Sequence, residues 1–289
     1  MTVKDWFTYH CLRSLGWVVG HIPRSLALST GRGLGNFIGY VAPVRARTAR
    51  RNLTLAFPEK SDAERRQILL NCYRHFGMVI MDFFRAQYLT RQQLEALVTV
   101  PNSALEQLRS TGRGILISAH LGNWEYILHT MGWLNIPFCA VAYIQKNRGA
   151  HRYFQSIREI SGSGILDKDG TTAPMIEFLD RGFLGLASDQ HAGSRGIWVD
   201  FFGHPSSTPT GAAYFAHKTR SAILFTVCIR RGDRYELEVQ DISPDYEKTG
   251  PRKTIYQQIN QRYMNVLEEA IRRNPEQYFW FHRRWRNIK

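Results

Sequence analysis

The 289-residue chain has little cysteine, no internal repeat and no segment of biased composition. Its four cysteines are scattered and form no Cys-x-x-Cys pair, which argues against a disulfide framework or a zinc site and favours a reducing compartment. With 44% hydrophobic and 21% charged residues, the composition is that of an ordinary folded protein. The length suits one large domain, or one domain with an appendage.

Two motifs of hydrolytic enzymes are also missing. No Gly-x-Ser-x-Gly elbow is present, so a serine acyl-enzyme of the α/β-hydrolase type is not supported. His120, Glu125 and His129 lack the His-Glu-x-x-His spacing of zinc hydrolases. A zinc hydrolase is therefore a distant alternative, and we expect no bound metal.

An uninterrupted apolar span is absent from the amino-terminal segment, residues 1–44. A tryptophan-bearing apolar stretch is broken by His10 and Arg13, and a second stretch, residues 33–44, is too short for the roughly 20 residues that cross a bilayer. No small-residue cleavage site follows, so we expect no secretory signal. An interfacial, membrane-associating helical segment fits best, and a pair of ordinary amphipathic helices packed on the domain is the alternative. Residues 45–289 form the predicted main domain.

Lysine is scarce although the chain is strongly basic. Of 38 basic residues 30 are arginine and 8 are lysine, and the net charge is +14. Arginine offers a planar fork for phosphate. No signature of a nucleic-acid-binding module appears, so we do not expect the protein to bind nucleic acid. We expect it to bind an anionic membrane surface, which attracts each nearby basic residue by about 1 kcal/mol. A basic cluster directly follows the apolar segment: Arg45, Arg47, Arg50 and Arg51. It indicates contact with acidic lipid head groups on the cytoplasmic side, and the alternative is a solvated helix face.

Short apolar runs alternate with helical patterns from residue 112 onward. We predict strands near residues 114–119, 138–144, 164–166, 184–188, 222–229 and 234–240. We predict helices near residues 123–134, 150–161, 172–181, 210–219 and 252–273. Such alternation indicates an α/β fold with a mainly parallel central sheet flanked by helices.

The stretch from Gly114 to Glu125 carries the clearest signal for chemistry. His120 directly follows the first predicted strand, and Glu125 lies in the first turn of the next helix, with Gly122 and Asn123 between them. Ligands gather at the carboxyl ends of strands in open α/β sheets. A carboxylate bound to one ring nitrogen fixes the tautomer and leaves the other nitrogen as a general base. The alternative is a glutamate favoured by the helix dipole beside a histidine that caps a backbone group.

The connection after the strand near 184–188 adds further candidates. Asp189 ends that strand as His120 ends its own, so both are expected along one sheet edge. The apolar run that includes Trp198 suits the lining of a groove for an alkyl chain, although a strand paired on the sheet edge would have the same sequence pattern. Arg158 and Arg195 are candidate phosphate ligands, or ordinary surface charges. Thr210-Gly211 begins a helix whose amides suit an anion.

With these residues assembled, the sequence resembles the bacterial lipid A biosynthesis acyltransferases, within the wider glycerolipid acyltransferase group that carries a His-x4-Asp/Glu motif. The likeness runs from about residue 48 to the end. It rests on Arg51-Asn-Leu-Thr-Leu-Ala-Phe-Pro58, His120-Leu-Gly-Asn-Trp-Glu125, Asp189-Gln190, Val199-Asp-Phe-Phe-Gly203 and Tyr278-Phe-Trp-Phe-His-Arg-Arg-Trp285. The resemblance implies an enzyme on the cytoplasmic face of a bacterial inner membrane. It would move an acyl chain from acyl carrier protein or coenzyme A to a hydroxyl of an anionic glycolipid.

The activity that the resemblance implies agrees with the chemistry expected of His120 and Glu125. His120 would take the proton of the acceptor hydroxyl, and Glu125 would orient the imidazolium. Backbone amides near Gly122 and Asn123, or an arginine, would stabilise the oxyanion. The acyl thioester is a co-substrate, and no further cofactor is expected. The aromatic and basic tail that ends the chain is expected to be packing plus a basic surface, with no site of its own.

Three alternatives stay open at this stage. Related branches place an acidic residue after the Phe-Phe-Gly segment, where this chain has His204, so Asp189 or Asp200 could share the task of Glu125. An acyl thioesterase would use the same pair with water as acceptor. A non-enzymatic protein that binds an anionic membrane would use only the charge.

Overall fold

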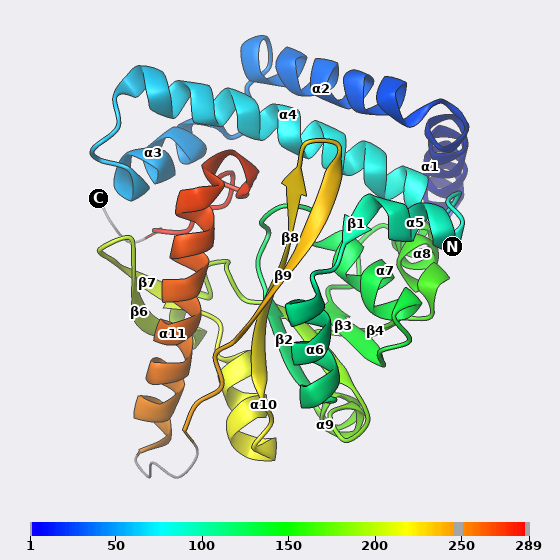
Figure 1. Ribbon diagram of the computed structural model, residues 1–289. Coiled ribbons are helices and arrows are strands. Elements are labelled where there is room, and N and C mark those ends of the chain that lie inside the picture. The colour runs from blue at the N-terminus through cyan, green and yellow to red at the C-terminus, as the bar shows by residue number, and fades with distance from the viewer. Residues whose placement is uncertain (1, 246–250, 287–289) are drawn as a thin grey trace.

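The computed structural model describes residues 2–245 and 251–286 of the chain (Figure 1). Within them lies a seven-stranded sheet in the order β1-β9-β8-β2-β5-β3-β4. Its strands are β1 (Val98–Thr99), β2 (Gly114–Ser118), β3 (Phe138–Ala142), β4 (Gly164–Asp167), β5 (Phe183–Ala187), β8 (Ile223–Arg231) and β9 (Arg234–Asp241). All neighbours are parallel except β8 and β9, which form an antiparallel hairpin. The prediction of a mainly parallel α/β sheet is confirmed.

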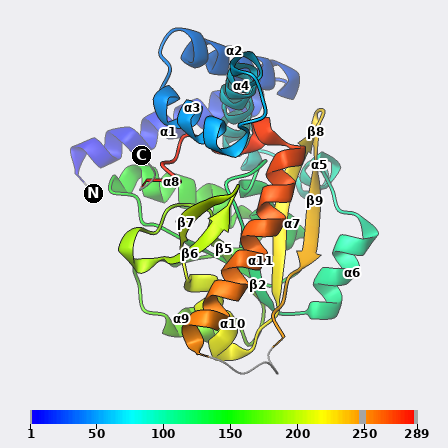
Figure 2. The same ribbon diagram turned by 90° about the vertical axis from the view of Figure 1, so that its left-hand side faces the viewer.

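Helices cover both faces of this sheet because the strand residues alternate in direction. Ile115 and Ile117 of β2 belong to one apolar core and Leu116 to the other. The first core lies under α9 (Ala173–Phe178), α10 (Gly211–Thr219) and α11 (Arg252–Arg273). The second lies under α5 (Arg91–Leu97), α6 (Asn102–Thr111), α7 (Glu125–Trp133) and α8 (Arg148–Arg158). Figure 2 shows α10 and α11 on one side of the sheet and α6 on the other.

The long connection after β5 folds into a hairpin of its own. Its strands are β6 (Ile197–Phe201) and β7 (His204–Thr208), which pair with each other and pack on α11. The residues of β6 alternate between buried and exposed, as in a strand with one face on the core. The strand alternative for this run is therefore the one the structure shows, in a separate two-stranded sheet and not on the edge of the main one.

Before α5 and the sheet, the described chain forms α1 (Val3–His21), α2 (Arg24–Tyr40), α3 (Ala46–Ala56) and α4 (Asp62–Ala86). Helices α2 and α4 run side by side across the top of Figure 1. Glycine allows this approach, since a Cβ on Gly31 would lie 2.5 Å from the carbonyl oxygen of Gly77. Among the described residues, no helix has the length and apolar character needed to span a membrane. Membrane association of residues 1–44 stays a prediction.

Short 3₁₀ turns complete the chain and lie near the site. They are η1 (Glu159–Ser161), η2 (Gly193–Arg195) and η3 (Pro275–Gln277). After η3, residues 278–285 lie beside the turn that follows β2, where Leu121 forms an antiparallel bridge with Tyr278. Helix α4 covers the same turn from above, because His75 contacts Gly122 and the ring of Phe76 contacts that of Trp124. The turn after β2 is thus enclosed by α4 and by residues 278–285.

Candidate active site

Two side chains meet at the carboxyl edge of the sheet because their strands pair in register. Strands β2 and β5 are parallel neighbours in which Ser118 aligns with Ala187. His120 and Asp189 each follow the aligned ends by the same distance along the chain, so they arrive side by side. The prediction that both residues lie along one sheet edge is confirmed.

His120 is held by Asp189 and not by Glu125. Its Nδ1 lies 2.8 Å from Oδ1 of Asp189, and its backbone N–H donates to Oδ2 of the same carboxylate at 3.1 Å. The predicted orientation of His120 by Glu125 is thus wrong for the hydrogen bond at Nδ1, and the alternative that named Asp189 holds. The parallel register of β2 and β5 places Asp189 beside His120, although two strands separate β2 from β5 along the chain. Glu125 begins α7 and pairs with Arg158.

Asp200, the other alternative, lies elsewhere. It is exposed on β6, where Oδ1 accepts the backbone N–H of Gly203 at 3.0 Å and closes the hairpin turn.

Burial and charge act in opposite directions on this pair. Burial favours neutral forms, but the charge and hydrogen bonds of the partner outweigh it, so the pKa of His120 is raised and that of Asp189 is lowered. Both shifts favour an imidazolium beside a carboxylate. The Nε2 atom receives no hydrogen bond from the described residues, and the side chain retains 26% exposure. With Nδ1 acting as donor, Nε2 is the basic nitrogen and is accessible.

Glu125 instead holds Arg158 in a two-point ion pair. Arg158 Nε lies 2.8 Å from Oε2, and Nη2 lies 2.6 Å from Oε1. The indole of Trp124 donates to Oε1 at 3.2 Å, and the guanidinium stands over the ring of Phe83. Such bidentate pairing fixes the plane of the guanidinium. The negative charge of Glu125 still contributes to the raised pKa of His120, after burial and Asp189.

A cavity of about 1040 Å³ opens beside this constellation. His120, Glu125, Arg158 and Arg195 all line it. Apolar side chains from several strands and helices line it as well: Leu116, Ile127, Leu128, Phe138, Ile165 and Met175. Basic side chains from other elements also reach it, namely Lys168 and Arg252. The cavity therefore combines apolar side chains, which suit an alkyl chain, with basic side chains, next to the free Nε2 of His120.

Asn123 does not reach this cavity. It is fully buried, and among the described residues neither polar atom of its side-chain amide has a hydrogen-bond partner. The predicted oxyanion amides are also occupied, because Gly122 N–H donates to the carbonyl of Gln277 at 3.0 Å and Asn123 N–H to that of Cys228 at 2.8 Å. Those amides are needed to hold the turn in place. The arginine alternative for the oxyanion remains.

Arg195 and Trp198 lie in different surroundings. Arg195 is exposed in η2 at the cavity mouth. Trp198 is 46% exposed on β6 and is not among the residues that line the cavity, because Ile197 and Val199 take the buried side of the strand. A substrate contact of Trp198 stays a prediction, but it does not arise in this cavity.

Sequence reasoning missed the residues behind the pair. His75 is buried, its Nε2 lies 3.1 Å from the carbonyl of Gly122, and burial lowers its pKa to about 4, so it is neutral and donates this bond. Phe279 N–H donates to the carbonyl of His120 at 2.9 Å. The motif that contains Phe279 was visible in the sequence, but its position beside His120 was not. Among the described residues, no group of three histidine, cysteine or acidic side chains gathers as a metal site would require.

The fold and site together place an accessible imidazole nitrogen beside a partly apolar cavity. Residues 3–287 match the family model of the bacterial lipid A biosynthesis acyltransferases, and the chain belongs to that family. It is 25% identical to the lipid A biosynthesis palmitoleoyltransferase of Escherichia coli and 26% identical to the lauroyltransferase of that organism. Each alignment covers 98% of this chain and 92% of the relative. A phosphatidylinositol mannoside acyltransferase of Mycobacterium tuberculosis is 26% identical over 57% of this chain and 55% of its own length. The protein is therefore an acyltransferase.

Proposed function

We propose that the protein transfers a fatty acyl chain from a thioester, on acyl carrier protein or coenzyme A, to a hydroxyl of a lipid A-type glycolipid precursor. The observation that carries this proposal is the free Nε2 of His120, oriented by Asp189 at the mouth of a partly apolar cavity. The relatives named for lipid A acylation support the acceptor class. No cofactor beyond the acyl thioester takes part.

The reaction is a direct transfer in this scheme. Nε2 of His120 accepts the proton of the acceptor hydroxyl while that oxygen bonds to the thioester carbonyl carbon, and the negative charge moves to the carbonyl oxygen. The carbon–sulfur bond then breaks as the carbonyl re-forms, and the thiolate leaves with the proton from Nε2. General-base assistance of this kind contributes about 10²–10⁴-fold to the rate. Asp189 stabilises the transient imidazolium.

Arg158 is the best-placed group for the developing oxyanion. Glu125 occupies its Nε and Nη2, and the described residues give Nη1 no hydrogen bond. A guanidinium fixed in this way is preorganised, which is what makes oxyanion stabilisation effective. Arg195 at the mouth is suited to a phosphate of the acceptor or donor.

Membrane contact follows from the surface of the amino-terminal helices. Helices α1 and α2 expose large apolar side chains, among them Trp6, Phe7, Trp17 and Phe37. Tyr143, at the rim of the cavity, is also exposed and precedes α8, on which α1 packs. We propose that this surface lies in the cytoplasmic face of a bacterial inner membrane and brings the cavity mouth to the lipid acceptor.

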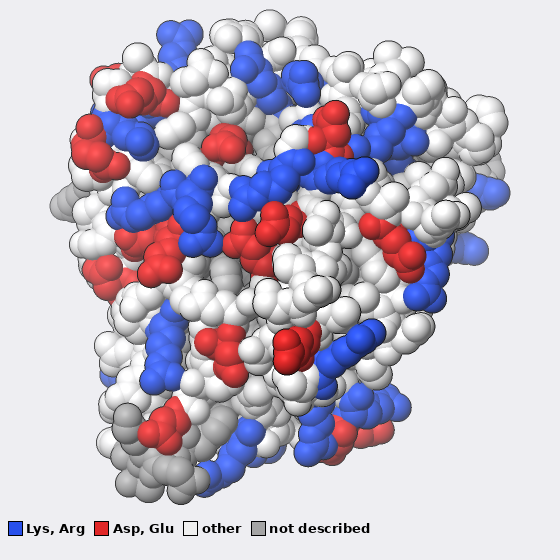
Figure 3. Space-filling view, in the orientation of Figure 1, with Lys and Arg blue, Asp and Glu red and all other residues white. Residues whose placement is uncertain are grey.

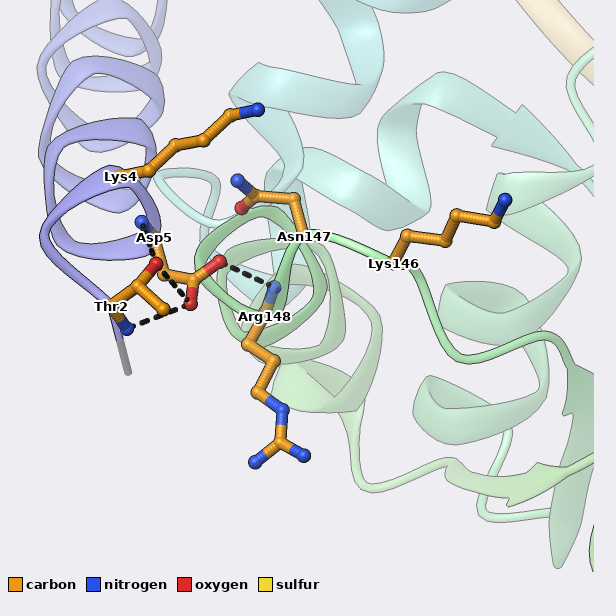
Figure 4. Close-up of a pocket in the computed structure, with 6 residues that line it drawn as sticks. All are labelled: Thr2, Lys4, Asp5, Lys146, Asn147 and Arg148. Atoms are coloured by element: carbon orange, nitrogen blue, oxygen red, sulfur yellow. Dashed lines mark hydrogen bonds between the residues drawn. The ribbon is translucent and has the colours of Figure 1, made fainter.

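Basic side chains adjoin the same region. Asp5 accepts the backbone N–H of Arg148 at 3.0 Å and so fixes the start of α1 to the start of α8. Figure 4 shows Lys4, Lys146 and Arg148 extending away from this junction. On the face drawn in Figure 3, by contrast, basic and acidic side chains are intermixed. Anionic head groups would thus find cations beside the exposed apolar helices.

The test combines the purified protein with dodecanoyl-coenzyme A or dodecanoyl acyl carrier protein and an under-acylated lipid A precursor. Mass spectrometry is expected to detect the acylated lipid with the wild type and none with His120→Ala. A His120→Ala variant as active as the wild type would refute the proposal.

A thioesterase is the second candidate, because the same base can activate water. Adding the acceptor lipid increases thioester consumption if transfer is the reaction. No increase would favour hydrolysis.

A further inference from the structure

One face of the central sheet carries a strip of small residues that begins at the strand ends beside His120. The four residues line the cavity and lie on the paired strands β5 and β3, two on each: Gly185, Ala187, Ala140 and Ala142. Alternate residues of a strand point to the same face, and the register aligns Ala140 with Gly185. The strip therefore lies on one side of the sheet.

Larger apolar side chains border this strip. Leu116 of β2 aligns with Gly185 on one side, and Ile165 of β4 aligns with Ala140 on the other. Helix α7 packs on the same face and contributes two further residues that line the cavity, Ile127 and Leu128. The strip is thus the bottom of an apolar trough between the sheet and α7.

The ring of Phe138 ends the trough. Phe138 lies on β3 two residues before Ala140 and so faces the same side. Its ring reaches over Gly185, because a Cβ on that glycine would lie 2.8 Å from Cε2 of the ring and closer still to Cζ. Phe183, which aligns with Phe138, is fully buried and is not among the described residues that line the cavity. The cavity therefore stops at Phe138, and only a glycine at position 185 leaves room for the ring.

The trough has the length of an acyl chain, and its basic neighbours lie outside it. Gly185 lies four residues before Asp189, so at most about 13 Å of extended backbone separates the ring of Phe138 from the His120–Asp189 pair. An extended acyl chain of medium length spans that distance. Basic side chains reach the cavity from other elements: Lys168 directly after β4, Arg195 in η2 and Arg252 at the start of α11.

We infer that the trough holds the acyl chain of the donor with its methyl end against Phe138, and that Phe138 and Gly185 together set the chain length that the enzyme accepts. This inference deepens the proposed function and rests on it for the nature of the donor. A chain that is too short leaves apolar surface uncovered, and one that is too long cannot place its thioester carbon beside His120. Phe138 and Gly185 touch no reacting atom and determine specificity.

The test moves the closed end of the trough in both directions. Phe138→Ala removes the ring and lengthens the trough, whereas Gly185→Ala adds a methyl group where the ring now lies and shortens it. The wild type and each variant are assayed with coenzyme A thioesters from octanoyl to hexadecanoyl and an under-acylated lipid A precursor. The readout is the dependence of kcat/KM on donor length.

We expect Phe138→Ala to favour longer donors. For a donor about two carbons longer than the one that the wild type prefers, its kcat/KM relative to that preferred donor should rise about 10-fold or more. Gly185→Ala should shift the preference to shorter donors. The double variant should accept longer donors than Gly185→Ala alone, because the added methyl group then has room. A preferred length that stays the same in both single variants would overturn the inference.

Two control variants disturb the packing without reaching the trough. Gly182→Ala places a Cβ 2.5 Å from the carbonyl oxygen of Pro137, and Phe84→Ala removes a buried ring of the same core; neither residue is among the described residues that line the cavity. Both should lower the melting temperature and leave the preferred length unchanged. A shift in the controls as large as in the test variants would attribute the effect to general loosening and overturn the inference. If Phe138→Ala or Gly185→Ala does not fold, the milder Phe138→Leu decides alone, and an unshifted preference overturns the inference.

Binding separates this inference from the proposed function. S-alkyl thioethers of coenzyme A with the same chain lengths cannot transfer an acyl group, and calorimetry measures their Kd. A wild type that transfers no acyl chain, beside variants that show the expected shifts in Kd, would refute the proposed function alone. An active wild type whose variants bind and use every length with unchanged preference would refute only the role of Phe138 and Gly185.

Discussion

Replacing Asp189 by asparagine tests which carboxylate serves His120. The side chain keeps its shape and its oxygen for the backbone N–H of His120, so the fold should be retained while the free energy of unfolding falls by the contribution of the lost bond. The charge-assisted hydrogen bond at 2.8 Å is lost. Such a bond to a charged group contributes about 1.5–3 kcal/mol, which corresponds to roughly a 10- to 150-fold lower kcat if it acts in the transition state.

The pKa of His120 should fall in the same variant. Burial lowers it, and the Asp189 charge that outweighs burial is gone. Acyl transfer measured from pH 5 to 9 would show a lower plateau whose acid limb lies at lower pH.

Glu125→Gln is the matched comparison, because it removes the other carboxylate of the site. Glu125 acts on Arg158, so this variant should raise KM and lower kcat through a loosened guanidinium, while the hydrogen bond at Nδ1 of His120 persists. An Asp189→Asn variant with wild-type kcat, beside a Glu125→Gln variant whose His120 has lost its orientation, would refute this assignment of roles.

Three further outcomes follow from the structure. Arg158→Lys should raise KM and lower kcat, since a point charge cannot replace the planar pair with Glu125; unchanged kinetic constants would contradict this. Burial lowers the pKa of His75 to about 4, so between pH 6.5 and pH 4 this histidine is protonated in the unfolded chain but not in the folded one. The free energy of unfolding therefore falls by up to about 1.4 kcal/mol for each pH unit over that range. Urea unfolding at pH 7 and pH 5 should show a smaller loss for His75→Gln. Gly31→Ala should destabilise by about 1–3 kcal/mol through a clash with Gly77, whereas Gly33→Ala, with open space around it, should stabilise by up to about 1 kcal/mol; equal melting temperatures would refute the close packing of α2 on α4.

The terminal segment changes how the family motifs are understood. Asn52 belongs to the motif that follows the basic cluster, and Arg284 belongs to the motif that ends the chain. In sequence they are far apart, and neither carries an obvious chemical role. The contacts of Asn52 hold the terminal segment, residues 278–285, in which Phe279 bonds to His120, whereas Arg284 fixes the same segment to Ser207 and Thr208 of β7.

Much of the fold followed from the sequence alone. Apolar runs separated by helical patterns predicted the main strands and the helices between them, because burial on both faces demands continuous apolar strands. The strand that ends just before His120 and the helix that has Glu125 in its first turn were predicted from local signals. The elements that were missed, such as β1, α5 and α6, are short or have weak periodicity.

The choice of partner for His120 was decided only by the tertiary structure. Proximity along the chain favoured Glu125, whereas the parallel register of β2 and β5 brings Asp189 to the imidazole. The amides of Gly122 and Asn123 looked free in sequence and are occupied by groups from distant segments. Local patterns report which residues form a strand or a helix, but strand order and register depend on interactions between segments far apart in the chain, and these place one carboxylate against the histidine and the other against an arginine.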